Sequence, residues 1–420
     1  MEVYKFGGAS IKDATAARNL LNVLANNQVK KMVIVLSAMG KTTNALEEII
    51  SVYLSTGKAT ELLSKLRDFH TQIAGELIPN PHHPIHTTLN FLFIDLEDAL
   101  EEGKDWEYDK FYDAVVPFGE IFSTTIISHF LTLNGFQTQW IDARKWLITN
   151  NNHRLAKVDW EETSENCDMF IRPFLDQRII ITQGFVGGTI EGIPTTLGRE
   201  GSDFTAGILG NCLNASKVTI WKDVPGVLNA DPKVFEKTEK FDQLSYAEAI
   251  EMAYYGASII HPKTLHPLQE KNIPLFVRPF SHPNEAGTQI FGNERTARKI
   301  PIKIIKDQQI LLTLRAKDGS FISESGIGKV FTLFGEFGVK LNMIQLSALS
   351  FSICFNETVP HVKEIIQKLS DDFRVLYNSN LQLITVRNFN DEVLAELNKG
   401  RIPLIEQRTR TTLHWIFPQD

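Results

Sequence analysis

Short apolar strands that alternate with helical segments restrict the fold of this chain more than any other feature. Residues 32–36 read MVIVL, and similar apolar runs lie at 178–182, 217–221 and 274–277. Strands that are apolar on both faces are typical of parallel sheets covered by helices. Helical segments separate them, among others at 118–131, 205–213 and 246–254. The alternation predicts an α/β domain with an open, mostly parallel sheet.

The sequence changes character at residues 291–301, FGNERTARKIP, a polar and charged stretch that ends in Pro301 and predicts a linker. Beyond it, strands and helices follow the order βαββαβ, which is ferredoxin-like. The expected strands are 309–315, 341–346, 349–354 and 372–377. A final βαββ segment, whose first strand is expected at 382–387, resembles a second unit that is cut short. We therefore expect two domains, at 1–295 and 304–420.

The composition excludes several classes of partner. The 420 residues carry a net charge of −7, which argues against nucleic acid as the main partner. The three cysteines, Cys167, Cys212 and Cys354, are far apart in the chain, which excludes a disulfide framework or a zinc cluster. No uninterrupted apolar run approaches about 20 residues, so we expect no membrane span. A cytoplasmic protein fits these observations.

Residues 183–206, QGFVGGTIEGIPTTLGREGSDFTA, hold the densest set of functional residue types. Their glycines allow close backbone approach, and the segment leads into a helix near Ser202 whose first amides attract anions. Arg199 offers a planar fork suited to a carboxylate, and Asp203 is suited to orient lysines around a phosphoryl group. The alternative is a glycine-rich hairpin with a surface arginine.

Three further polar loops follow strands of the same predicted sheet, KFGG at 5–8, SAMG at 37–40 and KD at 222–223. The carboxyl ends of parallel strands meet at one edge of a sheet, where ligands bind. We therefore expect one crevice whose charges include Lys5, Glu120, Arg199 and Asp203.

A nucleotide-binding P-loop is excluded. Gly40-Lys41-Thr42 has the form of the end of such a loop, but Val35 stands where the first glycine is required.

These segments resemble the motifs of aspartokinases. KFGGAS at 5–10 is similar to the family's KFGG[TS]S, and SAMGKTTN at 37–44, the Gly-Glu pair at 119–120 and the segment 183–206 match in order. Similar runs continue through DVPGVLNADPK, HPKTL and IPLFVRPF to Thr288. The resemblance covers essentially the whole chain. It implies a carbamate kinase-like amino-acid-kinase fold, followed by ACT-type regulatory modules.

The resemblance implies phosphoryl transfer from ATP, with Mg²⁺, to the β-carboxylate of L-aspartate. A carboxylate has a reference pKa of about 3.9, so this nucleophile needs no general base. The difficulty lies in bringing two anions together, which positive charge and backbone amides must offset. The product, 4-phospho-L-aspartate, begins the biosynthesis of lysine, threonine and methionine.

The resemblance also implies roles for individual residues. Glu120 would bind the substrate's ammonium and Arg199 its α-carboxylate, with Ser37 and Thr43 beside the substrate. Lys5 and Asp203 would be catalytic. The implied contacts to phosphates and nucleotide are Lys5, Gly7, Gly8, Ser10, Lys222, Asp223, Leu228, Lys233 and Ser258. No side chain is assigned to a metal.

Several positions depart from the family pattern, the mildest being Ala9 in place of the threonine of KFGGTS. Ser258 stands where the family has a lysine near the phosphates. Glu200 stands where the family has a glycine before the helix, and it adds negative charge near an anion site. Asn342, with Ser347 beyond it, stands where lysine-sensitive relatives carry an acid, and a neutral amide is a poorer partner for an ammonium.

These departures leave alternatives open. The chain could be a catalytically weak amino-acid sensor, or a sister amino-acid kinase with another carboxylate substrate. Feedback by lysine or threonine stays an open question, and 304–420 could serve dimerisation alone. We expect a homodimer or a higher homo-oligomer.

Overall fold

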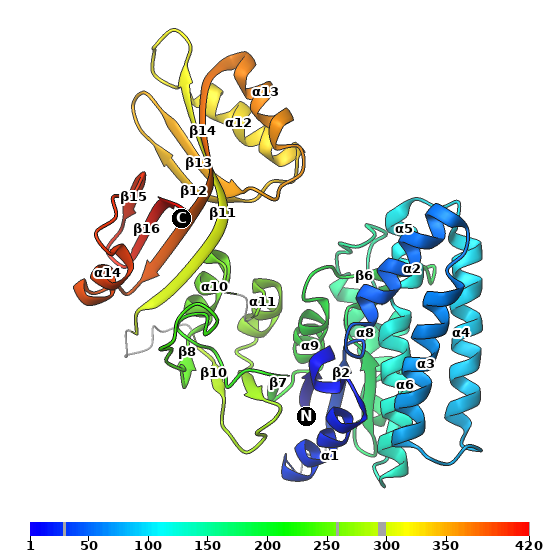
Figure 1. Cartoon of the computed structure of the whole chain (residues 1–420). Coiled ribbons are helices and arrows are strands. Elements are labelled where there is room, and N and C mark those ends of the chain that lie inside the picture. The colour runs from blue at the N-terminus through cyan, green and yellow to red at the C-terminus, as the bar shows by residue number, and fades with distance from the viewer. Residues whose placement is uncertain (28–30, 258–259, 293–299, 420) are drawn as a thin grey trace. The chain divides into compact units, whose positions relative to one another are not determined.

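The computed structural model describes residues 1–27, 31–257, 260–292 and 300–419 (Figure 1). The chain divides into two compact units, each described separately below. The first unit consists of 1–227, 240–250 and 258–296, and the second of 228–239, 251–257 and 297–420. Helix α10, Tyr246–Tyr255, therefore begins in the first unit and ends in the second.

The first unit is built on an eight-stranded sheet with the order β3-β4-β2-β1-β7-β9-β10-β8. Neighbouring strands run parallel except for β9 and β10, which confirms the predicted mostly parallel sheet. All five residues of β2 are buried, as its apolar sequence requires. The strands are β1 Glu2–Phe6, β2 Met32–Leu36, β3 Thr138–Trp140, β4 Ile179–Gln183, β7 Lys217–Lys222, β8 Gln243–Leu244, β9 Leu275–Pro279 and β10 Thr288–Ile290.

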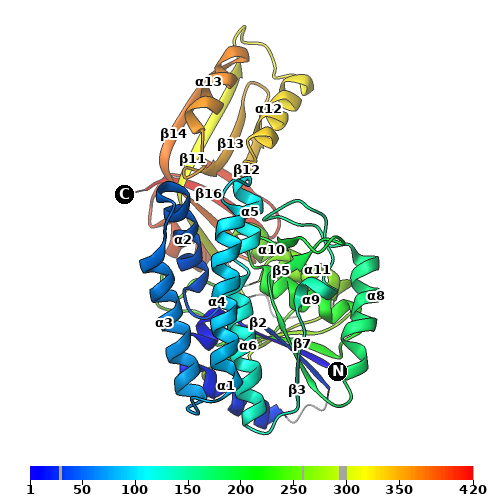
Figure 2. The same cartoon turned by 90° about the vertical axis from the view of Figure 1, so that its right-hand side faces the viewer.

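Helices α2, α3, α4 and α6 lie side by side as a layer of the first unit, and α6 packs on β2 and β4 (Figure 2). The segment Tyr108–Leu133 is long and apolar enough to cross a membrane, but 89% of its apolar window is buried inside the structure. It therefore fits the core of a globular unit. The helices here are α1 Ala14–Asn27, α2 Thr42–Thr56, α3 Thr60–Leu77, α4 Pro84–Gly103, α5 Tyr108–Val115 and α6 Phe118–Leu133.

The remaining elements of the first unit surround the carboxyl ends of the strands or cover the sheet. Strands β5 and β6 form a separate antiparallel hairpin that leads into α9. These elements are β5 Val186–Gly188, β6 Pro194–Thr196, α7 Ala143–Trp146, α8 Trp160–Phe170, α9 Gly201–Cys212, α11 Pro262–Glu270 and the short 3-10 helices Gly8–Ile11 and Arg172–Phe174.

The second unit contains a six-stranded antiparallel sheet with the order β12-β13-β11-β14-β16-β15. Helices α12 and α13 bury apolar side chains of this sheet in one core cluster. The element order β11-α12-β12-β13-α13-β14 confirms the predicted βαββαβ pattern. The elements are β11 Ile302–Ala316, α12 Glu324–Glu336, β12 Leu341–Leu346, β13 Phe351–Asn356, α13 Val362–Asp372, β14 Phe373–Arg387, α14 Asp391–Asn398, β15 Ile405–Arg408 and β16 Thr412–Pro418.

The bounds of three expected strands in this unit are wrong. The strands expected at 372–377 and 382–387 are one strand, β14, and β11 begins at Ile302 rather than at 309. The polar residues Asn378, Ser379 and Asn380 lie between the two expected strands. In the structure, β11 and β14 pair along their whole length, and register shifts near Gln309 absorb the irregularity. Cross-strand pairing therefore continues one strand through this polar stretch.

Candidate active site

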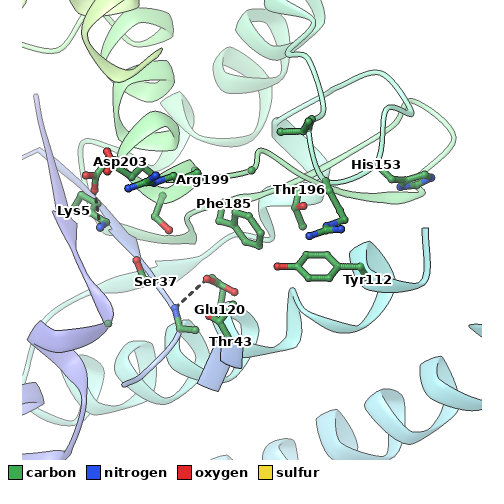
Figure 3. Close-up of a pocket in the computed structure, with 18 of the residues that line it drawn as sticks. Lys5, Ser37, Thr43, Tyr112, Glu120, His153, Phe185, Thr196, Arg199 and Asp203 are labelled. Carbon is green, nitrogen blue, oxygen red and sulfur yellow. Dashed lines mark hydrogen bonds and ion pairs between the residues drawn. The ribbon is translucent and has the colours of Figure 1, made fainter. Parts of the chain in front are cut away.

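Four neighbouring strands of the first unit end at an open pocket of about 770 Å³ (Figure 3). Lys5 belongs to β1, Ser37 follows β2, Phe185 follows β4 and Lys222 ends β7, and all four line the pocket. Because these strands run parallel, their carboxyl ends meet at one edge of the sheet. The structure thus brings together the loops that the sequence predicted to form one crevice.

Asp203, in the first turn of α9, is buried and holds two lysines. Its Oδ1 lies 2.6 Å from the Lys5 Nζ, and its Oδ2 lies 3.0 Å from the Lys222 Nζ. Burial favours the protonated acid, but the two ammonium groups outweigh it and hold the pKa of Asp203 below its usual range. The carboxylate therefore fixes two cations side by side at the start of α9, where helix amides also favour anions.

Glu120, in the first turn of α6, is a buried carboxyl group that is only half satisfied. One oxygen, Oε1, accepts a hydrogen bond of 3.2 Å from the Ala38 amide. The other, Oε2, is buried without a hydrogen-bond partner among the described residues. Burial raises the pKa of Glu120 to about 8, although the Ala38 amide and the charge of Lys5 oppose this. A cationic ligand group would satisfy the second oxygen and favour ionisation.

The other three predicted substrate residues also line this pocket. Ser37 is held in place because its amide donates to the Phe6 carbonyl at 3.1 Å, while its own carbonyl accepts from Ser123 Oγ at 2.7 Å. Thr43 lies in the first turn of α2. Figure 3 shows Arg199 on the wall that carries Asp203, opposite Ser37 and Glu120. A guanidinium, an acid and two hydroxyls thus surround one space.

A second part of the pocket wall is organised by Asp113 of α5, which is fully buried. Its carboxylate accepts hydrogen bonds from His153 Nδ1 at 2.9 Å and from the Arg154 amide at 3.0 Å. It also accepts from the Thr196 amide at 3.1 Å and from the Thr196 hydroxyl at 2.7 Å. Asp113 thereby ties the loop that contains His153 to the end of β6.

Comparison with known proteins now identifies the family. The model of the amino acid kinase family matches residues 1–279. Lysine-sensitive aspartokinase 3 of Escherichia coli is 31% identical over 357 residues, which are 85% of this chain and 78% of that protein. The chain belongs to the aspartokinases of the amino acid kinase family.

Longer relatives of this aspartokinase family member also match. Chloroplastic aspartokinase 1 of Arabidopsis thaliana is 29% identical over 88% of this chain and 66% of its own length. The chain spans 42% of a bifunctional aspartokinase/homoserine dehydrogenase from the same plant, at 29% identity.

Solved aspartokinase structures have the same fold. The structure of E. coli aspartokinase III with aspartate and ADP has a TM-score of 0.83 at 27% identity, and covers 100% of this chain and 96% of its own. The structure with lysine and aspartate has a TM-score of 0.82 at 28% identity, with the same coverage.

The predicted nucleotide residues of this aspartokinase, unlike the predicted substrate residues, do not all line the pocket. Gly8 lines the pocket, and a side chain there would approach the Ala38 carbonyl oxygen to 2.6 Å, so the close contact of two strand-end loops requires glycine. Gly7 precedes the first 3-10 turn, and the Ser10 hydroxyl donates to the Trp221 carbonyl. Asp223 directly follows β7. Leu228 and Lys233 belong to the second unit, and Ser258 lies outside the described residues.

Sequence reasoning missed Asp113 and the residues it binds. Asp113 follows aromatic residues in an ordinary amphipathic helix, and His153 and Arg154 lie in a polar loop, so nothing local marks them. Their partners are 40 or more positions away along the chain. Only the tertiary fold brings this group to the pocket.

Proposed function

We propose that this protein is an ATP-dependent aspartate kinase. It would transfer the γ-phosphoryl group of ATP to the β-carboxylate of L-aspartate and give 4-phospho-L-aspartate, the first step toward lysine, threonine and methionine. The observation that carries the proposal is that one pocket contains both the Lys5–Asp203–Lys222 array and the half-satisfied carboxyl group of Glu120. This pocket offers a phosphoryl site and an ammonium site together.

The chemistry needs positioning and positive charge more than proton transfer. The attacking β-carboxylate is already ionised at neutral pH, so no general base is required. In the proposed reaction, Lys5 and Lys222 stabilise the charge on the transferred phosphoryl oxygens, and Asp203 keeps both ammonium groups in place. The first amides of α9 add a partial positive charge at the same position.

The substrate's own charges would be matched by the opposite walls. Glu120 would accept the α-ammonium group on its free oxygen, and Arg199 would bind the α-carboxylate. The hydroxyl groups of Ser37 and Thr43 would donate hydrogen bonds to the substrate. An aspartate held at both α-groups would direct its β-carboxylate toward the phosphoryl site beside Lys5 and Lys222.

For the nucleotide, we propose contacts from Gly7, Gly8 and Ser10 after β1 and from Lys222 and Asp223 after β7. Leu228, Lys233 and Ser258 complete the proposed set. A Mg²⁺ ion bound with ATP would supply Lewis-acid neutralisation of the phosphate oxygens. Among the described residues, no group of three or more His, Cys, Asp or Glu side chains is arranged to hold a metal ion. The pocket therefore fits a cation that arrives with the nucleotide.

We further propose that residues 1–295 form the kinase domain and 304–420 an ACT-type region of a cytoplasmic homo-oligomer. Lysine is the first candidate effector, because one of the similar solved structures contains it. Asn342 and Ser347 are the candidate contacts. The Asn342 oxygen already accepts a hydrogen bond of 2.8 Å from Lys306 Nζ, so an effector ammonium would have to compete with Lys306.

Trapping the acyl phosphate with hydroxylamine tests the activity directly. The protein is incubated with ATP, Mg²⁺ and one acid at a time from aspartate, glutamate, N-acetylglutamate and bicarbonate. Hydroxamate formation with aspartate alone is expected. Formation with another acid would identify a sister kinase. Measurable amino-acid binding without any hydroxamate would instead support a sensor. Calorimetry with lysine, threonine and methionine tests the effector, and heat with lysine is expected.

A further inference from the structure

Glu200 occupies an unusual position on the wall of the kinase pocket. It is the residue immediately before α9, and its backbone adopts the left-handed conformation, with φ 55° and ψ 26°. Few residues other than glycine adopt this conformation without strain. Its side chain lines the pocket but does not cap the helix. Local helix stability therefore does not explain why a glutamate stands there.

The Glu200 carboxylate is also poorly satisfied. Its Oε2 is buried and has no hydrogen-bond partner among the described residues. A buried anionic oxygen without a partner costs free energy, which a bound cation would recover. The terminal torsion of a glutamate is broad, so the carboxylate can rotate to present an oxygen to a cation in the pocket that Glu200 lines.

The pocket as a whole has little positive charge to spare for a polyphosphate. Its lining contains four acids, Asp109, Glu120, Glu200 and Asp203, and four strong bases, Lys5, Arg154, Arg199 and Lys222. Lys5 and Lys222 both pair with Asp203. A nucleotide that brings several negative charges here needs a divalent cation, and Mg²⁺ is typically bound by one or two carboxylates together with phosphates.

Of the acids around the phosphoryl site, Glu200 is the best suited to bind that cation. Both oxygens of Asp203 are engaged by ammonium groups. Glu120 is held by the Ala38 amide, on the opposite side of the pocket from Asp203 (Figure 3). Glu200 lies three residues before Asp203, beside the same helix N-terminus.

We propose that the Glu200 carboxylate is a direct protein ligand of the divalent cation that enters with the nucleotide. The inference rests on the proposed ATP-dependent function. This role would explain why a glutamate occupies the left-handed position. A single carboxylate and a polyphosphate can bind one cation together without a dedicated metal cluster in the protein.

The test measures Mn²⁺ binding to the full-length protein with bound ADP, by electron paramagnetic resonance of free and bound Mn²⁺. The variants are Glu200→Gln, which removes the charge but keeps the shape, and Glu200→Gly, which also relieves the backbone. Glu191→Gln in the β5–β6 turn is the matched control. We expect both Glu200 variants to bind Mn²⁺ in the ADP complex at least about tenfold more weakly, because loss of even an outer-shell partner typically costs roughly 10–100-fold in metal affinity. The control should match the unaltered protein.

Other results would overturn the proposal. Equal Mn²⁺ affinity in Glu200→Gln and the unaltered protein would contradict it. So would stronger ADP binding by Glu200→Gln without a change in Mn²⁺ affinity, which would make Glu200 only a repulsive charge. Calorimetry of ADP with and without Mg²⁺ separates the two proposals. If ADP binds to the unaltered protein but the Mn²⁺ affinities agree, only the metal proposal fails. If ADP does not bind at all, both fail.

Discussion

The two sheets of this protein place polar residues in different ways. In the first unit, parallel strands β4, β2, β1 and β7 send their carboxyl ends to one edge, and the charged pocket lies there. In the second unit, antiparallel strands alternate their ends, so no edge collects successive loops. Its main polar group lies instead on the sheet itself, where Asn342 links Lys306, Gln309 and Asn356.

The two arrangements suit different roles. A strand-end pocket leaves charged groups such as Lys5 and Glu120 next to a space that a ligand can enter. In the sheet cluster, amides bond mainly to one another. The Asn342 Nδ2 donates to Gln309 Oε1 at 2.7 Å and to Asn356 Oδ1 at 2.8 Å. Substitutions in the strand-end pocket should therefore alter the rate of phosphoryl transfer, and substitutions in the sheet cluster should alter the stability of the fold.

The largest effect is expected for Lys5→Met. The variant removes one of the two ammonium groups at the phosphoryl site, and phosphoryl transfer should fall by about a thousandfold. Hydroxamate formation measures the loss, and circular dichroism checks that the fold persists. Lys58→Met, at an exposed position, is the control and should keep full activity. A loss of activity below tenfold in Lys5→Met would contradict the assignment of phosphoryl transfer to the strand-end pocket.

Asp203→Asn should reduce turnover by about a hundredfold, because the two lysines lose the group that positions them. It should also change the response to acid. The folded-state pKa of Asp203 is lowered, so its stabilising effect is present above the unfolded pKa and is lost as the pH falls through the folded value. Urea unfolding at pH 7 and pH 3 should therefore show a smaller loss of unfolding free energy in Asp203→Asn. An equal loss would contradict the ion-pair account.

Glu120→Gln should raise the KM for aspartate about tenfold with a smaller effect on kcat, because it removes the charge that meets the ammonium. The pH profile adds a sharper criterion. With a pKa of about 8, Glu120 is largely protonated at pH 7, so the KM of the unaltered protein should fall between pH 7 and pH 8.5. In Glu120→Gln this fall should disappear. A fall of the same size in the variant would assign the titration to another group.

The smallest effect is expected for Lys306→Met in the second unit. Burial and the neighbouring Lys340 lower the pKa of Lys306 to about 8. The unfolded chain then binds more protons than the folded one between about pH 8 and the reference value near 10.4, so Lys306 makes stability rise over that interval. Thermal unfolding at pH 8 and pH 10 should show a smaller rise in Lys306→Met. Hydroxamate formation should not change. A large loss of activity would contradict the inference that substitutions in the second sheet alter stability alone.

The predictable part of the structure is the part encoded locally. The apolar run at 32–36 and the glycine-rich segment 183–206 identify a buried strand and a strand-to-helix junction by their own residues. The sequence predicts Lys5 and Asp203 as charges of one crevice because the carboxyl ends of parallel strands meet at one edge of a sheet.

What the sequence could not reveal depends on long-range pairing. Asp113 looks like a helix surface residue until the fold places His153 and Thr196 against it. Likewise, β14 looks like two strands until β11 pairs along its whole length. Leu228 and Lys233 fall in motif order beside Asp223, yet the compact unit that contains them is a different one.

The second unit is built from segments that are far apart in the sequence, and this affects how it folds during synthesis on the ribosome. Segments 228–239 and 251–257 emerge early but belong to the second unit, whose strands come from residues after 300. Tyr255 packs against His414, and Glu251 forms an ion pair with Arg387. At translation rates of about 5–20 residues per second, these early segments wait roughly ten to thirty seconds for their partners. During that interval, a chaperone bound to the nascent chain would protect α10, whose second half cannot yet be buried.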